Sequence, residues 1–79
     1  PNPFNPRTEV HYTLPRNGQS LLRVFYARGR EVARPLDAAA LAGAGRVAWD
    51  ASGLASGIYF AELSLDGEVL ASRKLTLVR

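Results

Sequence analysis

The chain has 79 residues, 47% of them apolar, a net charge of +3 and no cysteine. This length is enough for one domain and not for two. Since no disulfide can form and ligand-type side chains are too few for a structural metal, apolar packing alone is expected to hold the fold. Basic and acidic residues are interleaved along the chain, which argues against nucleic-acid binding. The sequence has no run of 18 apolar residues, so insertion into a membrane is not predicted.

The first residues predict a stiff, extended lead-in over residues 1–7. They contain three prolines and two Asn-Pro steps, and each proline pushes the residue before it toward extended backbone. Phe4 is expected to plug one end of the core. Pro1 is an unusual natural start, so the chain is expected to be a piece of a longer or processed protein. The lead-in residues singled out as a candidate docking segment are Asn2, Pro3, Phe4, Asn5 and Pro6.

Alternating apolar and polar residues predict the strands in chain order. Residues 8–14 alternate cleanly and form the first strand, and the pair Asn17-Gly18 then supplies a tight turn. Further strands are expected over residues 20–26, 31–36, 46–50 and 58–65. Pro35 places the third strand at a sheet edge or in an irregular position, because proline cannot donate a ladder hydrogen bond.

Two stretches are not covered by these strands, residues 37–45 and residues 66–79. The alanines of residues 37–45 favour a helix, but the glycines would end one within about one or two turns. This stretch therefore predicts a loop with at most a single helical turn. The pair Asp66-Gly67 predicts a second hairpin, after which residues 68–79 form one or two strands.

Short strands with turn signals about every eight to twelve residues predict an all-β fold, an immunoglobulin-like antiparallel β-sandwich of six to seven short strands. Asp50 is expected to cap the turn after Trp49. Tyr59 is expected to bury its ring and return its hydroxyl to a loop carbonyl, as in a tyrosine corner, and Gly57 permits the backbone geometry before it. The predicted core residues are Val10, Tyr12, Leu22, Val24, Trp49, Tyr59 and Leu63.

No catalytic, cofactor or metal site is predicted. His11 is the one histidine, and it is expected on the solvent face of the first strand beside Glu9. A Ser-His-Asp arrangement needs a strained nucleophile and an oxyanion pocket, and Ser56 comes one place too late for a nucleophile elbow. The acidic residues show no metal-ligand spacing. The chain is therefore expected not to be an enzyme and to bind no cofactor.

The terminal strand is the feature that points most directly to a function. Leu75 and Leu77 share one face and Lys74 lies on the other, so the basic pair Lys74 and Arg79 brackets an apolar ladder. Chain ends usually fray unless they are tied into a sheet. Taken alone, an apolar strand that continues to the last residue fits an ordinary closing strand with solubilising ends. Together with the proline-rich lead-in at the other end of the chain, it predicts that this end is recognised by another macromolecule.

Five stretches of the sequence together form a recognisable pattern: Pro1-Asn2-Pro3-Phe4-Asn5-Pro6, Leu22-Arg23-Val24-Phe25, Trp49-Asp50, Ser56-Gly57-Ile58-Tyr59 and the segment from Lys74 to Arg79. With these motifs the chain resembles one family over its whole length, the C-terminal sorting domain (type A) of proteins secreted by the bacterial type IX system. This family is related to the immunoglobulin-like domain of the flagellar hook-capping protein. The closing strand fits the family's two basic residues separated by four others, here Lys74 and Arg79. The chain departs from the family at Tyr26, where an acidic residue is common.

The resemblance implies a non-catalytic domain that folds in the periplasm and is recognised by the outer-membrane secretion machinery, which delivers the protein outside or onto the cell surface. Such domains are typically cleaved when the cargo is attached to surface lipopolysaccharide. An edge strand offers unpaired backbone groups for strand addition by a receptor, and flanking cations add orientation and on-rate. The residues expected to carry or shape recognition are Gly57, Tyr59, Lys74, Leu75, Leu77 and Arg79.

Two other interpretations stay open. In the first, the chain is a structural subunit of a cell-surface filament or array, a homo-oligomer in which the lead-in docks on a neighbour as a donated strand. In the second, it is a scaffold module like that of the hook-capping protein. The sequence leaves open whether the lead-in packs in cis or in trans, what the oligomeric state is, and whether the domain is cleaved after export.

Overall fold

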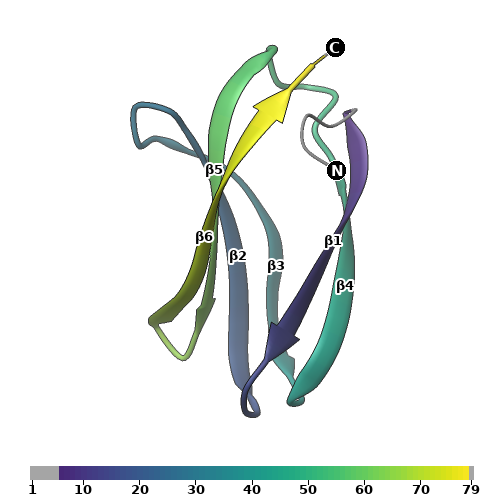
Figure 1. Ribbon diagram of the computed structural model, residues 1–79, viewed down its shortest axis with the longest axis vertical. Coiled ribbons are helices and arrows are strands. Elements are labelled where there is room, and N and C mark those ends of the chain that lie inside the picture. Colours follow the sequence, from purple (N-terminus) through teal and green to yellow (C-terminus); the bar gives the residue numbers. More distant parts are fainter. Residues whose placement is uncertain (1–5, 79) are drawn as a thin grey trace.

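The computed structural model describes residues 6–78, and this range forms six β-strands and no helix (Figure 1). All pairings are antiparallel and join the strands into two sheets, β1-β4 and β3-β2-β5-β6. The predicted all-β sandwich is therefore confirmed. The strands are β1 (Arg7–Leu14), β2 (Gly18–Tyr26), β3 (Glu31–Ala40), β4 (Gly43–Asp50), β5 (Gly57–Leu65) and β6 (Glu68–Leu77).

Most of the lead-in lies outside the described residues. The prediction that Phe4 plugs one end of the core concerns one of these residues and stays a prediction. Pro6 is described, and its carbonyl oxygen accepts a hydrogen bond from the backbone N–H of Ala51 at 2.6 Å. This bond extends the pairing of β1 with β4 by one step beyond the two strands. The residues of earlier interest that lie outside are Asn2, Pro3, Phe4, Asn5 and Arg79.

The pair Asp66-Gly67 forms the β5-β6 hairpin that the sequence predicts. Both residues have positive φ, 50° and 85°, as a two-residue type I′ turn requires. The Asp66 carboxylate also accepts a hydrogen bond from the backbone N–H of Gln19 at 2.8 Å, and the Asp66 N–H donates to the Gln19 carbonyl at 2.9 Å. The turn is therefore anchored to the start of β2 as well as to its own strands.

Asp50 caps the turn after β4, as predicted. Its Oδ1 accepts a hydrogen bond from the backbone N–H of Ser52 at 2.9 Å. Hydrogen bonds with Ser52, and beyond them the charge of Arg7, hold the pKa of this carboxyl below its ordinary value. The carboxylate therefore helps to end β4 at this residue.

The predicted loop over residues 37–45 is wrong, because β3 continues to Ala40 and β4 already starts at Gly43. The alanine-rich part of β3 pairs with the first half of β2, where the Ser20 hydroxyl donates a hydrogen bond to the Ala38 carbonyl at 2.9 Å. Cross-strand pairing thus overrides the low strand propensity of alanine. The expectation of an edge position for the strand with Pro35 is confirmed.

Gly45 shows how a glycine is accommodated inside β4. It lies directly opposite Tyr12 in the register, and a Cβ built on Gly45 would lie 2.5 Å from the Tyr12 ring. The ring therefore covers the position where a side chain would be, an arrangement known to stabilise glycine within a sheet. The glycines of this stretch are thus compatible with a strand rather than a signal of a loop.

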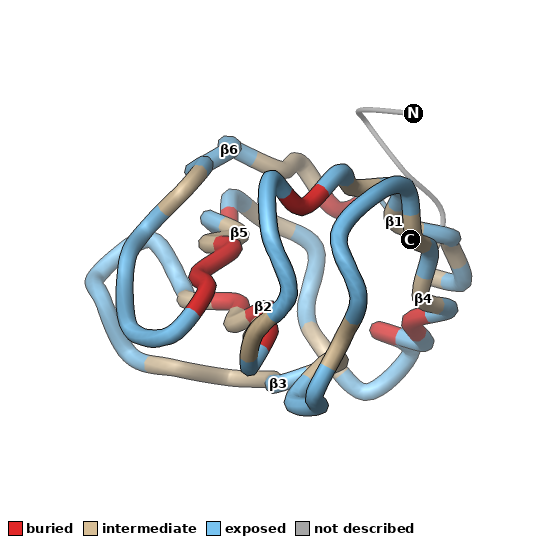
Figure 2. The backbone as a smooth tube through the Cα atoms, turned by 90° about the horizontal axis from the view of Figure 1, so that it is seen from below, coloured by how far each residue is buried: buried red, intermediate tan, exposed pale blue. Residues whose placement is uncertain are grey.

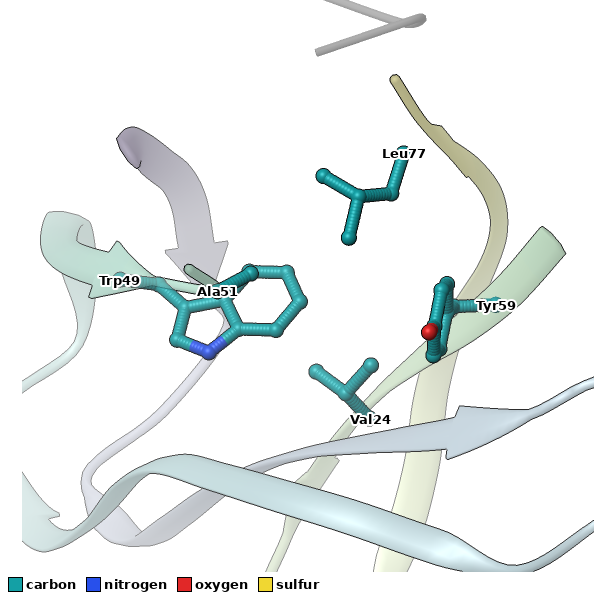
Figure 3. Close-up of a cluster of buried hydrophobic side chains, with 5 residues drawn as sticks. All are labelled: Val24, Trp49, Ala51, Tyr59 and Leu77. Carbon is teal, nitrogen blue, oxygen red and sulfur yellow. The ribbon is translucent and has the colours of Figure 1, made fainter. Parts of the chain in front are cut away.

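Apolar side chains from both sheets meet in a first cluster (Figure 3). Trp49 comes from β4, whereas Val24, Tyr59 and Leu77 come from three strands of the other sheet. Ala51, just beyond β4, completes the cluster. These contacts therefore join the two sheets at one end of the sandwich.

A second cluster lies between the same sheets. Its buried members are Leu14, Leu22, Leu63 and Leu65. The partly buried side chains of Val10 and Tyr12 pack against it. The residues predicted as core are thus all in these two clusters or packed against them, with Leu22, Val24, Trp49, Tyr59 and Leu63 buried.

The sandwich leaves two strand edges unpaired along one side. β3 and β4 adjoin through a short connection, residues 41–42, whereas β6 and β1 lie along the opposite side (Figure 2). In the described range β6 pairs with β5 alone and β1 with β4 alone. β6 is one strand and ends at Leu77, so the prediction that the strand continues to the last residue is wrong at Val78.

Trp49→Ala and Tyr59→Ala are each expected to lower the free energy of unfolding by roughly 3–5 kcal/mol, because each leaves a cavity between the sheets. In a domain this small, that loss should abolish cooperative folding, as measured by circular dichroism on heating. Val69→Ala, at a side chain that is 55% exposed, is the control and should change stability by less than about 0.5 kcal/mol. A cooperative melt of either core variant near the wild-type temperature would contradict the assignment.

Gly45→Ala is expected to destabilise the fold by about 1–3 kcal/mol, because the new Cβ must displace the Tyr12 ring. Gly53→Ala is the matched control, since a Cβ there would meet no atom within 4 Å. Urea denaturation compares the two variants with the wild type. Equal midpoints for all three proteins would show that the ring does not cover Gly45.

Candidate functional site

β6 positions the residues that the sequence singles out for recognition. Leu77 is 1% exposed and Leu75 packs against the first cluster, whereas Lys74 is exposed on the opposite face. In the register, Leu77 pairs with Gly57 and Leu75 pairs with Tyr59. The structure therefore brings five of the six predicted recognition residues together on β5 and β6, and the sixth lies outside the described residues.

Tyr59 fixes the start of β5 beside the end of β6. Its ring is buried, and its hydroxyl donates a hydrogen bond to the Ala55 carbonyl at 2.6 Å, which is the predicted tyrosine corner. Tyr26 meets this ring edge-on, with 5.5 Å between ring centres, a contact that the sequence did not indicate. Gly57 has φ of 156°, a backbone conformation that side chains disfavour. Tyr59 is buried and supports β6 from within the core, whereas Tyr26 remains 38% exposed beside it.

An apolar groove of about 460 Å³ runs between β1 and β6. Its lining includes three side chains of the four-stranded sheet, Leu22, Ala61 and Leu63, together with Trp49 of β4. Residues 8–13 of β1 and residues 70–73 of β6 border it on either side. The sequence did not predict this groove, because it depends on which two strands lie at neighbouring edges of the sheets.

Strand edges as well as side chains border the groove. Side chains alternate between the faces of a strand, so a space lined by six consecutive residues of β1 and four of β6 must border the edge of each strand. The backbone groups that point away from the single partner of an edge strand are open to pairing with a further strand. The groove can therefore bind an extended polypeptide through its backbone.

Arg73 is a charged side chain on the inner face of β6. It pairs with Ala61, which lines the groove, so the two side chains project from the same face of the sheet. The Arg73 side chain is exposed and forms no hydrogen bond or ion pair with another residue of the range 6–78. Strand alternation already puts Arg73 on the same face as Leu75 and Leu77 in the sequence. The prediction nevertheless singled out Lys74, on the other face.

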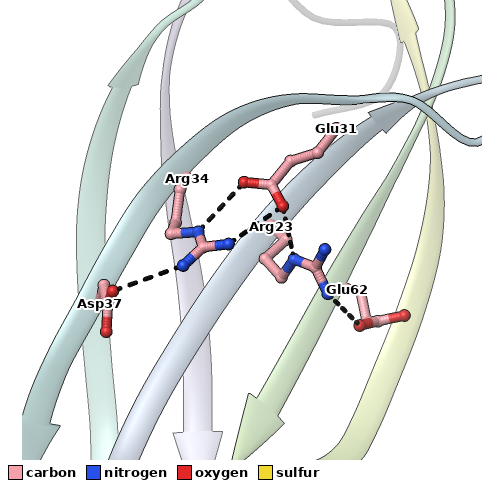
Figure 4. A network of polar contacts seen from close by, with 5 residues as sticks. All are labelled: Arg23, Glu31, Arg34, Asp37 and Glu62. Carbon is pink, nitrogen blue, oxygen red and sulfur yellow. Dashed lines mark hydrogen bonds and ion pairs between the residues drawn. The ribbon is translucent and has the colours of Figure 1, made fainter.

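The outer face of the four-stranded sheet carries a network of charged side chains (Figure 4). The Glu31 carboxylate accepts hydrogen bonds from Arg23 Nε at 2.8 Å and Arg34 Nε at 3.1 Å. Arg23 also lies 3.9 Å from Glu62, and Arg34 lies 3.7 Å from Asp37. Hydrogen bonds with Arg34 and then Arg23 hold the pKa of Glu31 below its ordinary value of 4.5. Within this network each charged side chain has an oppositely charged partner, so the five residues hold β2, β3 and β5 together on this face.

Groups that could perform catalysis are dispersed. His11 is exposed on β1 with its Nε2 3.0 Å from Glu9 Oε1, whereas Ser20 and Ser64 are buried. Within residues 6–78, no group of three or more His, Cys, Asp or Glu side chains could hold a metal ion. The part of the chain that the structure describes has no helix long and apolar enough to cross a membrane.

No protein-family model matches this chain, and comparisons with curated proteins and with solved structures give no match. The function is therefore inferred from the residues, the strand edges and the groove.

Acidification is expected to weaken the fold through Glu31. Its pKa is lowered in the folded state, so its contribution to stability is present above a pH of about 4.5 and is lost as the pH falls through the folded-state pKa. Glu31→Gln removes the titrating group and should therefore show a smaller fall in Tm than the wild type between about pH 6 and pH 3. Identical dependence of Tm on pH in the two proteins would show that the network does not depress this pKa.

Proposed function

We propose that this chain is a non-catalytic C-terminal sorting domain that directs a bacterial protein through the type IX system to the cell surface. The outer-membrane secretion machinery recognises it as a folded domain in the periplasm. The observation that carries the proposal is the position of β6, which packs Leu75 and Leu77 against the body of the domain and leaves Lys74 exposed. The free edge of β6 offers backbone groups to a receptor strand.

The resemblance of the sequence supplies the type IX part of the proposal. Two of its motifs lie where they support β6. Ser56-Gly57-Ile58-Tyr59 leads into β5, which pairs with β6. Trp49, from the motif Trp49-Asp50 that ends β4, packs in the first cluster with Leu77 of β6. A cation next to a strand edge increases the on-rate and sets the orientation of a partner more than it adds affinity. Lys74 is in this position.

Export of a fused reporter tests the proposal. The domain is joined to an unrelated periplasmic reporter in a bacterium that has the type IX system, with and without residues 75–79. The intact fusion is expected at the cell surface or in the medium, and the truncated fusion is expected to stay in the periplasm, as measured by cell fractionation and protease accessibility. Equal export of both fusions would overturn the proposal.

Lys74→Ala separates recognition from folding, because deletion of residues 75–79 also removes the buried side chain of Leu77. Export should fall severalfold in Lys74→Ala, while the Tm stays close to that of the wild type because the side chain is exposed. Arg46→Ala is the matched control, since Arg46 is an exposed cation on β4 in the other sheet. An equal loss of export in both variants would contradict a role for β6.

A second candidate is a structural subunit that assembles into a filament or array at the cell surface. Among residues 6–78, β1 and β6 each have one edge without a paired strand, which favours this candidate because such an edge can accept a strand from a neighbour. Light scattering and electron microscopy of the purified chain at high concentration test this candidate. A strict monomer would exclude it.

A further inference from the structure

We propose that the groove between β1 and β6 binds an extended segment of a partner protein as an added strand that places a carboxylate against Arg73. This inference deepens the proposed recognition function and rests on it. It states what the partner must present: an extended backbone, apolar side chains at alternate positions, and one acidic side chain among them.

The sandwich is one strand short at this position. The order β3-β2-β5-β6, with its two hairpins, corresponds to strands C′, C, F and G of an immunoglobulin-like domain, and the pair β1-β4 corresponds to B and E. In that fold strand A lies beside strand B. Within residues 6–78 nothing pairs with this edge of β1, and the groove lies along it. An added strand would therefore complete the sheet and cover its apolar lining.

The five residues that precede Pro6 in this sequence do not suit the groove. Six consecutive residues of β1, residues 8–13, border it, so an added strand must offer backbone donors along this length. Pro1 and Pro3 also lack the N–H that a ladder requires, and these five residues include no carboxylate. A segment of a partner protein that has backbone N–H groups and a carboxylate therefore suits the groove better than these five residues.

Arg73 determines which charge the added strand should carry. It stands at the β6 side of a groove whose lining is mainly apolar, where a guanidinium and a carboxylate form strong, charge-assisted hydrogen bonds. A rival explanation is that Arg73 only guards the edge against aggregation, as inward-pointing charges on edge strands do. A guarding charge would oppose every added strand, whereas a recognition residue distinguishes strands by charge.

Titration of the 79-residue chain with designed peptides tests the proposal. Three soluble nine-residue peptides alternate valine with threonine: the first has a central glutamate, the second a central lysine, and the third a central glutamate with prolines in place of the threonines. Trp49 lines the groove and is the one tryptophan, so its fluorescence reports binding. The glutamate peptide should bind at least about tenfold more tightly than the lysine peptide. The proline peptide should not bind, because its backbone lacks half of its donors.

Arg73→Glu is expected to reverse the preference between the two charged peptides, and Arg73→Gln is expected to abolish it. Arg28→Glu is the control, because Arg28 is an exposed cation in the β2-β3 connection and does not line the groove. Circular dichroism verifies that each variant is folded. Hydrogen exchange should show new protection in β1 and β6 when the glutamate peptide binds.

Four results would overturn the proposal: no peptide binds, both charged peptides bind equally, the preference survives Arg73→Glu, or light scattering shows that a second copy of the chain occupies the groove. The peptide test is also separable from the export test. Export without peptide binding would overturn the groove proposal alone, whereas charge-dependent binding without export would overturn the sorting function alone.

Discussion

The indole of Trp49 reaches from the two-stranded sheet into a cluster with Val24, Tyr59 and Leu77 of the four-stranded sheet (Figure 3). A two-stranded sheet is marginal by itself, and the chain has no cysteine that could link it to the other sheet. Apolar contact between the sheets is therefore what keeps β1 and β4 in place. The groove exists because this contact, together with the second cluster, holds the edges of β1 and β6 on the same side of the sandwich.

Local sequence patterns were sufficient to predict the features that depend on residues close together in the sequence. The Asp66-Gly67 hairpin follows from the positive φ values that a two-residue turn demands, and the Asp50 cap follows from the affinity of a carboxylate for a nearby N–H. Tyr59 combines a buried ring with a hydroxyl bonded four residues upstream. Alternation also placed Leu75 and Leu77 on the inner face and Lys74 on the outer face.

Features that depend on residues far apart in the sequence could not be predicted from local patterns. The alanines of β3 form a strand because β2 lies beside them, and Gly45 fits into β4 because Tyr12 covers it from β1. No propensity of these segments reveals such partners. The groove is a product of topology as well, so Arg73 gains its significance only when the pairing with Ala61 shows where its side chain points.

Leu77 is both the last residue of β6 and a member of the cluster that joins the sheets. A force that peels β6 away from β5, starting at Leu77, would break the hydrogen bonds of this pair one after another. The first apolar side chain withdrawn would be Leu77, which would loosen the hold of Trp49 at the same moment. The end of β6 is therefore coupled, through one side chain, to the contacts that hold the two sheets together.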